Sequence, residues 1–210
     1  MKIGILGTGN LASALGKALT HKGYRVMFGG RDLAKANGLA GQMEHFAQGG
    51  TLANAIHYGE ILFLAVPYKA VESVLRTSDT YRGKIVVDCT NPLIPGEWFD
   101  VALGHTTSAA EQIAKMIPEA KVVKAYNTAF VELIADGPYF GAHDASMFYC
   151  GDDEEAKEAV GKVIAATGFD PVDCGPLDSA RLLEPMAALL IRLGINKGMG
   201  REIAFKLLSR

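Results

Sequence analysis

The sequence predicts an α/β fold in which helices cover both faces of a doubly wound, mainly parallel sheet. Two observations lead to this prediction. Short apolar runs alternate with segments of helical periodicity along nearly the whole chain, and the first apolar run ends in a glycine-rich turn that opens a helix. With 210 residues, 49% of them hydrophobic, the chain can bury one such core. We therefore expect residues 1–210 to form a single domain.

The expected strands are short apolar runs that end at glycine, proline or polar residues. The clearest is the run at 61–66, which Pro67 stops, and the weakest lies near residues 50–51. The complete set comprises residues 2–6, 24–28, 50–51, 61–66, 84–88, 121–125, 146–150 and 170–174.

Helices are expected between these strands, at 11–20, 33–46, 52–58, 69–75, 108–117 and 152–166. Ser108 and Glu111 have the spacing of a capping box, and the four acids that begin the helix at 152 suit the dipole of its first turn. The segments 93–107 and 132–144 are expected to be irregular. A mostly helical C-terminal tail is expected over about 177–210.

The first turn of the chain has the pattern of a dinucleotide-binding loop. Residues 7–12, Gly7-Thr8-Gly9-Asn10-Leu11-Ala12, match G-x-G-x-x-A between a strand and a helix. Gly7 permits the tight turn, Gly9 lets a pyrophosphate approach the backbone, and Ala12 allows the helix to pack closely on the strand. The pyrophosphate would then meet the free N–H groups of the helix N-terminus. This context predicts a Rossmann-type cofactor site rather than a glycine-rich turn that binds nothing.

The second strand suggests NADP(H) rather than NAD(H). NAD enzymes carry an acid at the end of this strand that binds the ribose 2′-hydroxyl, whereas here the strand is followed by Gly30 and Arg31. The guanidinium of Arg31 suits a 2′-phosphate, with Thr8 and Lys35 as further donors. Asp32 is expected to cap the following helix. Alternatively, Arg31 is a solvated surface charge and either cofactor is accepted.

Several short motifs extend beyond this loop. They are Gly30-Arg31 with Lys35, Ala65-Val66-Pro67, and the segments SAAE at 108–111, CGDD at 150–153, DCGPL at 173–177, SARLLE at 179–184 and GMG at 198–200. On these motifs the chain resembles the NADPH-dependent reductases of the deazaflavin coenzyme F420. It is also similar to the cytosolic oxidoreductase domain of six-transmembrane metalloreductases. The resemblance runs nearly end to end.

The resemblance implies roles for individual residues. Thr8, Gly30, Arg31 and Lys35 would surround the 2′-phosphate, and Asn127 and Thr128 would lie near the nicotinamide, although neither is assigned a certain catalytic role. Together with the loop motif, this gives the expected cofactor-binding set: Gly7, Thr8, Gly9, Asn10, Leu11, Gly30, Arg31, Lys35, Ala65, Val66, Pro67, Asn91, Pro92 and Asn127.

The expected activity is NADPH-dependent hydride transfer to a flavin or to a deazaflavin such as F420. Such a transfer depends on stacking and orientation more than on a strong acid or base. Some deazaflavin reductases have His where this chain has Asn127, and an Asn there is more similar to the metalloreductases. The electron acceptor therefore stays open between a flavin, a deazaflavin and flavin-assisted reduction of ferric or other metal ions.

Two further alternatives differ in chemistry. A small carbonyl or imine reductase would need a proton donor, and the candidates His105, His143 and Lys124 are more simply surface or structural residues. Cys89 could be a nucleophile, but a small buried residue is the stronger interpretation. A non-catalytic NADP(H)-sensing module is the third possibility.

Composition limits the partners. The net charge of −2 with interspersed signs offers no footprint for nucleic acid, and no apolar run approaches the ~20 residues of a membrane span. Three scattered cysteines and five histidines without ligand spacing predict no disulfide or metal site. We expect a cytoplasmic protein acting on a small redox substrate.

The C-terminal tail carries more apolar surface than one helix face needs. The apolar positions are Leu182, Leu183, Met186, Leu189, Leu190 and Leu193. Such a surface must be buried on the sheet or against a second chain, so we expect a homodimer. Pro185 is expected either to kink this helix or to begin its main segment.

Overall fold

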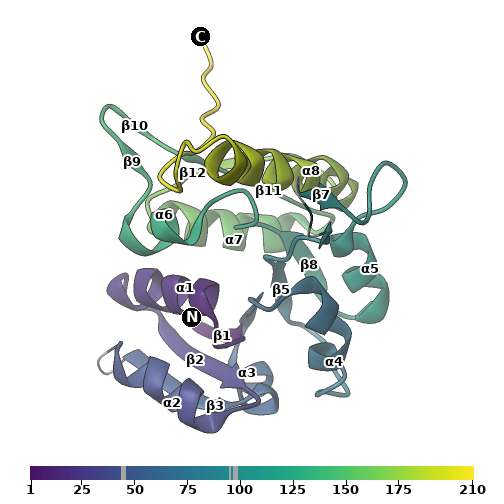
Figure 1. The fold of residues 1–210 in the computed structure, drawn as a ribbon. Coiled ribbons are helices and arrows are strands. Elements are labelled where there is room, and N and C mark those ends of the chain that lie inside the picture. Colours follow the sequence, from purple (N-terminus) through teal and green to yellow (C-terminus); the bar gives the residue numbers. More distant parts are fainter. Residues whose placement is uncertain (44–45, 95, 97–98) are drawn as a thin grey trace.

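A computed structural model describes residues 1–43, 46–94, 96 and 99–210. Its centre is an eight-stranded sheet with the order β12-β11-β8-β5-β4-β1-β2-β3 (Figure 1). The strands from β3 to β8 in this order are parallel, β11 is antiparallel to β8, and β12 is parallel to β11. The predicted doubly wound, mainly parallel sheet is therefore confirmed. The strands are β1 Lys2–Leu6, β2 Arg25–Gly30, β3 Ala47–Thr51, β4 Ile61–Leu64, β5 Ile85–Asp88, β8 Lys121–Lys124, β11 Ser146–Gly151 and β12 Asp170–Asp173.

Helices cover both faces of this sheet. One face packs against α1 Asn10–His21, α2 Leu33–Gly41, α6 Val131–Asp136 and α7 Glu154–Ala166. The other packs against α3 Leu52–Tyr58, α4 Val71–Leu75, α5 Ala109–Met116 and α8 Ala180–Ile191. Short 3₁₀ turns, Tyr68–Ala70 and Leu177–Ser179, precede α4 and α8. Within the described residues, no helix combines the length and apolar character that crossing a membrane requires.

Burial on both faces explains why the central strands are continuous apolar runs. Ile61 and Phe63 of β4 belong to the core beneath α1, whereas Leu62 and Leu64 belong to the core beneath α3 and α4. All four side chains are at most 1% exposed. Alternate residues of one strand thus serve two cores, as a covered parallel sheet requires.

The second helix is shorter than its sequence pattern predicts. It ends at Gly41 instead of near Phe46, and β3 is longer than expected, beginning at Ala47. Of the predicted helix 33–46, residues 44–45 lie outside the described residues. The helix ends early because the chain has to reach the edge of the sheet, where Ala47 pairs with Val26 of β2.

The prediction of irregular structure at 132–144 is wrong. This segment forms most of α6 and a small hairpin of β9 Tyr139–Phe140 and β10 His143–Asp144. Gly137 and Gly141 have φ values of 103° and 64° and therefore form turns between these elements. Within 93–107, a second short hairpin joins β6 Leu93–Ile94 to β7 Asp100–Val101.

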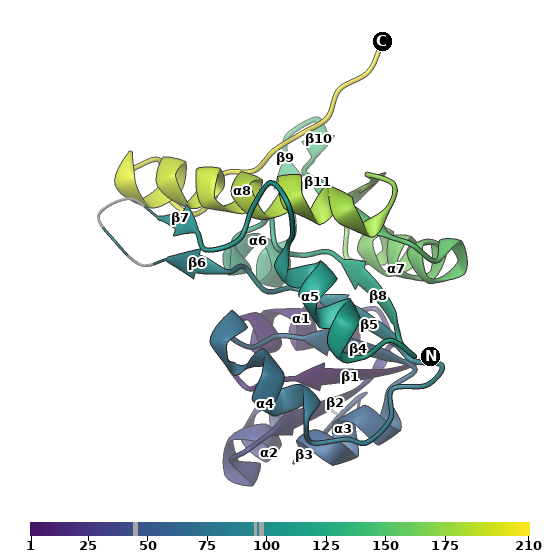
Figure 2. The ribbon, with the colours of Figure 1, turned by 90° about the vertical axis from the view of Figure 1, so that its right-hand side faces the viewer.

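The expected helical tail over 177–210 is only partly correct. The helix α8 contains Pro185 in its interior and is followed by a π-helical turn, Arg192–Asn196. Beyond it the chain has no regular helix, because Gly198 and Gly200 adopt positive φ values and turn it back. The final segment then runs back along α8 towards β11 (Figure 2), where the Ser146 N–H donates to the Phe205 carbonyl at 2.9 Å.

Candidate functional site

The expected site residues gather at the carboxyl ends of the parallel strands. Gly7 follows β1, Arg31 follows β2, Ala65 follows β4, Asn91 lies in the loop after β5, and Asn127 lies in the loop after β8. These strands are neighbours in the sheet, so the five loops lie along one edge. This is the edge at which open α/β sheets bind their ligands, with the change of winding direction between β1 and β4.

The turn from β1 into α1 has the backbone shape that phosphate binding needs. Gly7 has a φ of 138°, and a Cβ there would collide with the carbonyl oxygen of Ala65. Its N–H donates to the Gly29 carbonyl at 2.8 Å, which ties the turn to β2. A Cβ on Gly9, in contrast, would meet no atom within 4 Å. Gly9 therefore leaves open space in front of the first turn of α1, where a pyrophosphate would meet free N–H groups.

Unpaired cations flank the end of β2. Arg31 and Lys35 are exposed, and neither forms an ion pair with another residue in the described parts of the chain. Thr8 lies beside Gly30, the residue before Arg31, because a Cβ on Gly30 would be 2.7 Å from the Thr8 methyl group. Asp32 caps α2 as predicted, accepting from the Ala34 N–H at 2.9 Å and the Lys35 N–H at 3.2 Å. With Asp32 engaged in this cap, the two cations are available to an anionic group.

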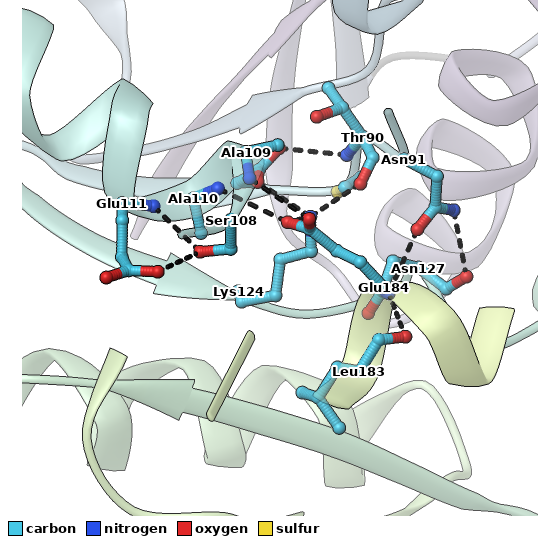
Figure 3. Close-up of polar contacts among 12 residues, drawn as sticks. Thr90, Asn91, Ser108, Ala109, Ala110, Glu111, Lys124, Asn127, Leu183 and Glu184 are labelled. Atoms are coloured by element: carbon cyan, nitrogen blue, oxygen red, sulfur yellow. Dashed lines mark hydrogen bonds and ion pairs between the residues drawn. The ribbon is translucent and has the colours of Figure 1, made fainter. Parts of the chain in front are cut away.

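A pair of amide side chains occupies the loops after β5 and β8. The Nδ2 of Asn127 donates to Asn91 Oδ1 at 3.1 Å and to the Leu183 carbonyl at 2.9 Å. In return, Asn91 Nδ2 donates to the Asn127 carbonyl at 3.2 Å. Figure 3 shows this pair beside the start of α8, the helix that contributes Leu183. The contacts thus link two strand ends to α8.

The remaining oxygen of this pair is a buried acceptor without a donor. Asn127 is 5% exposed, and its Oδ1 has no hydrogen-bond partner. The amide cannot be reversed, because both groups around Nδ2 are acceptors and would repel an oxygen there. Buried acceptors are nearly always satisfied, so Oδ1 fits a ligand that carries an N–H donor, such as a carboxamide.

Next to the amide pair lies a buried cluster of charged side chains (Figure 3). The ammonium of Lys124 donates to Asp88 Oδ2 at 2.8 Å, to Glu184 Oε1 at 2.9 Å and to the Thr90 carbonyl at 2.5 Å. Lys124 and Asp88 are fully buried, and the Glu184 side chain is 1% exposed. The three acceptors use all three ammonium hydrogens, so Lys124 is a structural residue, as the simpler interpretation expected.

Burial and charge act in opposite directions on Lys124. Burial alone lowers the pKa of its ammonium, but the neighbouring Asp88 and Glu184 outweigh this, and the pKa is raised above its ordinary value. Burial also raises the pKa of the Tyr68 phenol nearby, with Glu184 and Asp88 adding to the effect. Lys124 therefore stays charged and Tyr68 neutral at physiological pH.

Sequence reasoning missed Asp88 and Glu184. The sequence alone places Asp88 at the end of an apolar strand and Glu184 in the SARLLE motif, and it gives neither residue a role. The signal that could have found them is charge beside buried apolar residues: Lys124 follows the buried Val122 and Val123, and Glu184 follows the buried Leu183 in an apolar helix. A buried charge requires a partner of opposite sign.

The remaining candidates are placed as follows. His105 and His143 are exposed, which agrees with surface histidines. Cys89 is buried, and burial together with Asp88 raises the pKa of its thiol well above the ordinary value, so it is no ready nucleophile. Pro92 and Thr128 are buried near the amide pair, and Pro67 is exposed at the end of the β4 loop.

A small cavity opens beside the amide pair. Its volume is about 230 Å³, and its lining includes Asn91, Asn127, Phe99, Phe130, Ile195 and Arg201. The Arg201 guanidinium lies over the Phe130 ring at 5.4 Å and pairs with Glu132 at 3.0 Å. The cavity thus has aromatic and aliphatic walls, the two amides on one side and a cation at its rim.

Comparisons with known proteins identify the family. Residues 2–92 match the family NADP oxidoreductase, coenzyme F420-dependent. The F420-dependent NADP reductase of Methanocaldococcus jannaschii is 30% identical over 221 residues, covering 97% of this chain and 98% of that protein. The chain belongs to this family. The resemblance noted in the sequence is therefore confirmed, and with it the Rossmann-type fold and the oxidoreductase class.

Two further relatives cover different fractions of their own length. The metalloreductase STEAP3 of Rattus norvegicus is 34% identical over 190 residues, which cover 90% of this chain. The chain spans only 37% of the length of that protein. A crystal structure assigned as an F420-dependent NADP reductase from Arthrobacter sp. FB24 superposes with a TM-score of 0.89 at 30% identity, covering 100% of both chains. The chain is thus similar both to proteins of its own length and to part of a much longer one.

Proposed function

We propose that this protein is an NADPH-dependent oxidoreductase that transfers hydride between NADP(H) and a flavin or deazaflavin such as F420. The observation that supports the cofactor is the end of β2, where Arg31 and Lys35 are exposed without an ion pair among the described residues, and where the nearby acid Asp32 caps α2. The family relatives named as F420-dependent NADP reductases support the acceptor.

The residues of the site fit the cofactor along its length. Gly7 and Gly9 leave room for the pyrophosphate at α1, with Asn10 and Leu11 beginning that helix. Arg31 would select the 2′-phosphate, and Ala65, Val66 and Pro67 would border the cofactor. The nicotinamide would then lie over β5 and β8, where the unpartnered Asn127 Oδ1 would accept from its carboxamide.

Bound NADPH would supply a hydride, a proton with two electrons, to the acceptor ring. The nicotinamide ring that gives up the hydride becomes positively charged. The protein's own residues orient the two rings and exclude water. The cavity beside Asn127, with Phe99 and Phe130 in its walls, would receive part of the acceptor ring. Asn91, Pro92 and Thr128 would support the nicotinamide side without acting as acids or bases.

A spectroscopic assay tests this proposal. In separate reactions, the protein is mixed with NADPH or NADH and with F420, FMN, FAD, a ferric chelate, or a ferric chelate together with FMN or FAD. We expect oxidation of NADPH with F420 or a flavin, and slower oxidation of NADH. Tight NADPH binding without turnover of any acceptor would instead identify a cofactor-sensing module.

Metal reduction is the second candidate, because of the 34% identity to a metalloreductase. The assay separates the two, since flavin-assisted metal reduction requires the ferric chelate and added flavin together. A carbonyl or imine reductase is less well supported, because Lys124 is buried with three acceptors and cannot serve as a proton donor to a substrate.

We also propose that residues 1–210 act as one NADP-binding domain and as a cytoplasmic homodimer. On α8, Leu183 and Leu190 are buried, whereas Leu182 is 72% and Leu189 49% exposed. The exposed residues form an apolar face directed away from the sheet, which a second copy would cover. Sedimentation equilibrium at micromolar concentration should show a dimer, and the change Leu182→Glu with Leu189→Glu should shift it to monomer.

A further inference from the structure

The buried cluster of Asp88, Lys124 and Glu184 is not electrically neutral. Every hydrogen bond to these two carboxylates comes from an N–H group. Asp88 accepts from the Thr90 N–H and from the Lys124 ammonium. Glu184 accepts from the Lys124 ammonium and from the backbone N–H groups of Ala109 and Ala110. A protonated carboxyl would need an acceptor in one of these places, and no hydrogen-bond acceptor occupies them. Two carboxylates and one ammonium therefore leave a net charge of −1.

The start of α5 offsets only part of this charge. Glu184 accepts from Ala109 N at 3.0 Å and from Ala110 N at 3.3 Å, the first two residues of that helix. A helix N-terminus is equivalent to about half a positive charge. Tyr68 stays neutral, so it adds no further negative charge. A negative potential remains in a region from which water is excluded.

This cluster is joined directly to the amide pair. Asp88 ends β5 three residues before Asn91, and Lys124 ends β8 three residues before Asn127. Glu184 follows Leu183, whose carbonyl holds the Asn127 side chain. Figure 3 shows Lys124, Glu184, Asn91 and Asn127 in one neighbourhood. The charge thus lies beneath the same strand ends that carry the unpartnered Asn127 Oδ1.

The order of the strands places the nicotinamide half of a dinucleotide at this end. Arg31 follows β2, on one side of β1, whereas β4, β5 and β8 lie on the other side. With the pyrophosphate at α1 and the 2′-phosphate at Arg31, the other half of the cofactor has to extend over β5 and β8. This step rests on the proposed function.

We infer that Asp88 and Glu184 set the redox preference of the bound cofactor, because their excess negative charge favours the oxidised nicotinamide over the reduced one. The oxidised ring carries a positive charge and the reduced ring is neutral, so a negative potential stabilises only the oxidised form. Preferential binding of NADP⁺ lowers the reduction potential of the bound couple and makes bound NADPH the stronger hydride donor. Asp88 and Glu184 act here through their field, without touching the reacting atoms.

The size of the effect follows from electrostatics. A unit charge acting over about 10 Å at an effective dielectric constant of about 20 changes a binding equilibrium on the order of tenfold. Neutralising either carboxylate should therefore raise the ratio of dissociation constants, NADP⁺ to NADPH, by about tenfold.

The experiment measures both dissociation constants by isothermal titration calorimetry for the wild type, Glu184→Gln and Asp88→Asn. Asp88 lies on β5 and Glu184 on α8, so if one variant fails to fold, the other still allows the ratio to be measured. A ratio that rises in the folded variant supports the inference. A ratio that falls, or one that stays constant because the two dissociation constants change by the same factor or not at all, overturns the inference. The cluster would then have only a structural role.

Two controls separate charge from structure. The double change Asp88→Asn with Lys124→Met removes one charge of each sign, leaves the net charge at −1, and should keep the wild-type ratio. Glu158→Gln removes an exposed carboxylate of α7 that pairs with Lys162 in solvent, away from the buried cluster, and it should also keep the ratio. If the wild-type protein bound neither form of the cofactor, the proposed function itself would fail, which is a different outcome from an unchanged ratio.

Discussion

The two ends of the candidate site are built in different ways. The phosphate end consists of consecutive residues, 7–12 and 30–35, and its important features are backbone shape and exposed cations. The nicotinamide end consists of residues from β5, β8 and α8, and its important features are buried side chains that satisfy one another. The first end depends on local geometry, and the second depends on the whole tertiary structure.

This difference predicts that mutations at the two ends will have different consequences. At the phosphate end, changes to the exposed side chains should mainly alter cofactor binding, because these side chains face solvent. At the nicotinamide end, changes should mainly alter folding, because each buried charge depends on its partners.

The largest effect is expected from Lys124→Met. Removal of the ammonium leaves Asp88 and Glu184 buried without a counter-charge, which should lower the free energy of unfolding by about 4 kcal/mol. Urea denaturation followed by circular dichroism measures this. The matched control is Lys17→Met, which removes an exposed ion pair with Asp136 and should change stability little. Equal losses in the two variants would contradict the distinction between the ends.

A glycine pair within the phosphate end should separate folding from binding. Gly7→Ala places a Cβ against the Ala65 carbonyl at a φ of 138°, so we expect a loss of about 3 kcal/mol in unfolding free energy. Gly9→Ala meets no atom within 4 Å and should remain stable, but its methyl group occupies the approach to α1 and should abolish most NADPH binding. Denaturation and calorimetry of both variants test this, and tight NADPH binding by Gly9→Ala would argue against a pyrophosphate at this turn.

A smaller and more selective effect is expected from Arg31→Ala. Loss of a charged hydrogen bond to the 2′-phosphate costs about 2 kcal/mol, which corresponds to about 30-fold weaker binding of NADPH. NADH lacks this phosphate, so its dissociation constant should stay nearly constant. Arg25→Ala, at the opposite end of β2, serves as the control for a lost positive charge. Equal weakening of NADPH and NADH would show that Arg31 does not recognise the phosphate.

The smallest effect concerns pH and the docking of α8. A hydrogen bond from Arg181 is the main reason why the pKa of Glu111 lies below its ordinary value of 4.5. Burial acts to raise this pKa, and a second hydrogen bond, from Ser108, lowers it further. Because the folded-state pKa is depressed, this stabilisation is present above about pH 4.5 and is lost as pH falls through the lower folded value. The stability difference between wild type and Glu111→Gln should therefore shrink below this pH. A constant difference in denaturation midpoints from pH 7 to pH 3 would contradict the assignment.

Local signals predicted most elements but not their exact ends. The Asp32 cap forms as its sequence position predicts, and Ser108 accepts from the Glu111 N–H at 3.2 Å. The second half of that expected capping box differs: the Glu111 carboxylate accepts from the Ser108 hydroxyl and pairs with Arg181 instead of reaching the backbone. A residue 70 positions away thus changes a local motif, which sequence spacing cannot reveal.

The sequence by itself determined the alternation of strands and helices, the turn at Gly7 and Gly9, and the cations after β2. These features depend on backbone dihedrals and on periodicity within a few residues, so they can be predicted without a partner. Only the tertiary structure decided that Asp88, Lys124 and Glu184 meet, and that Asn127 keeps one oxygen unpartnered. The physical reason is that a buried charge or amide is defined by what surrounds it, and here its surroundings come from three distant segments.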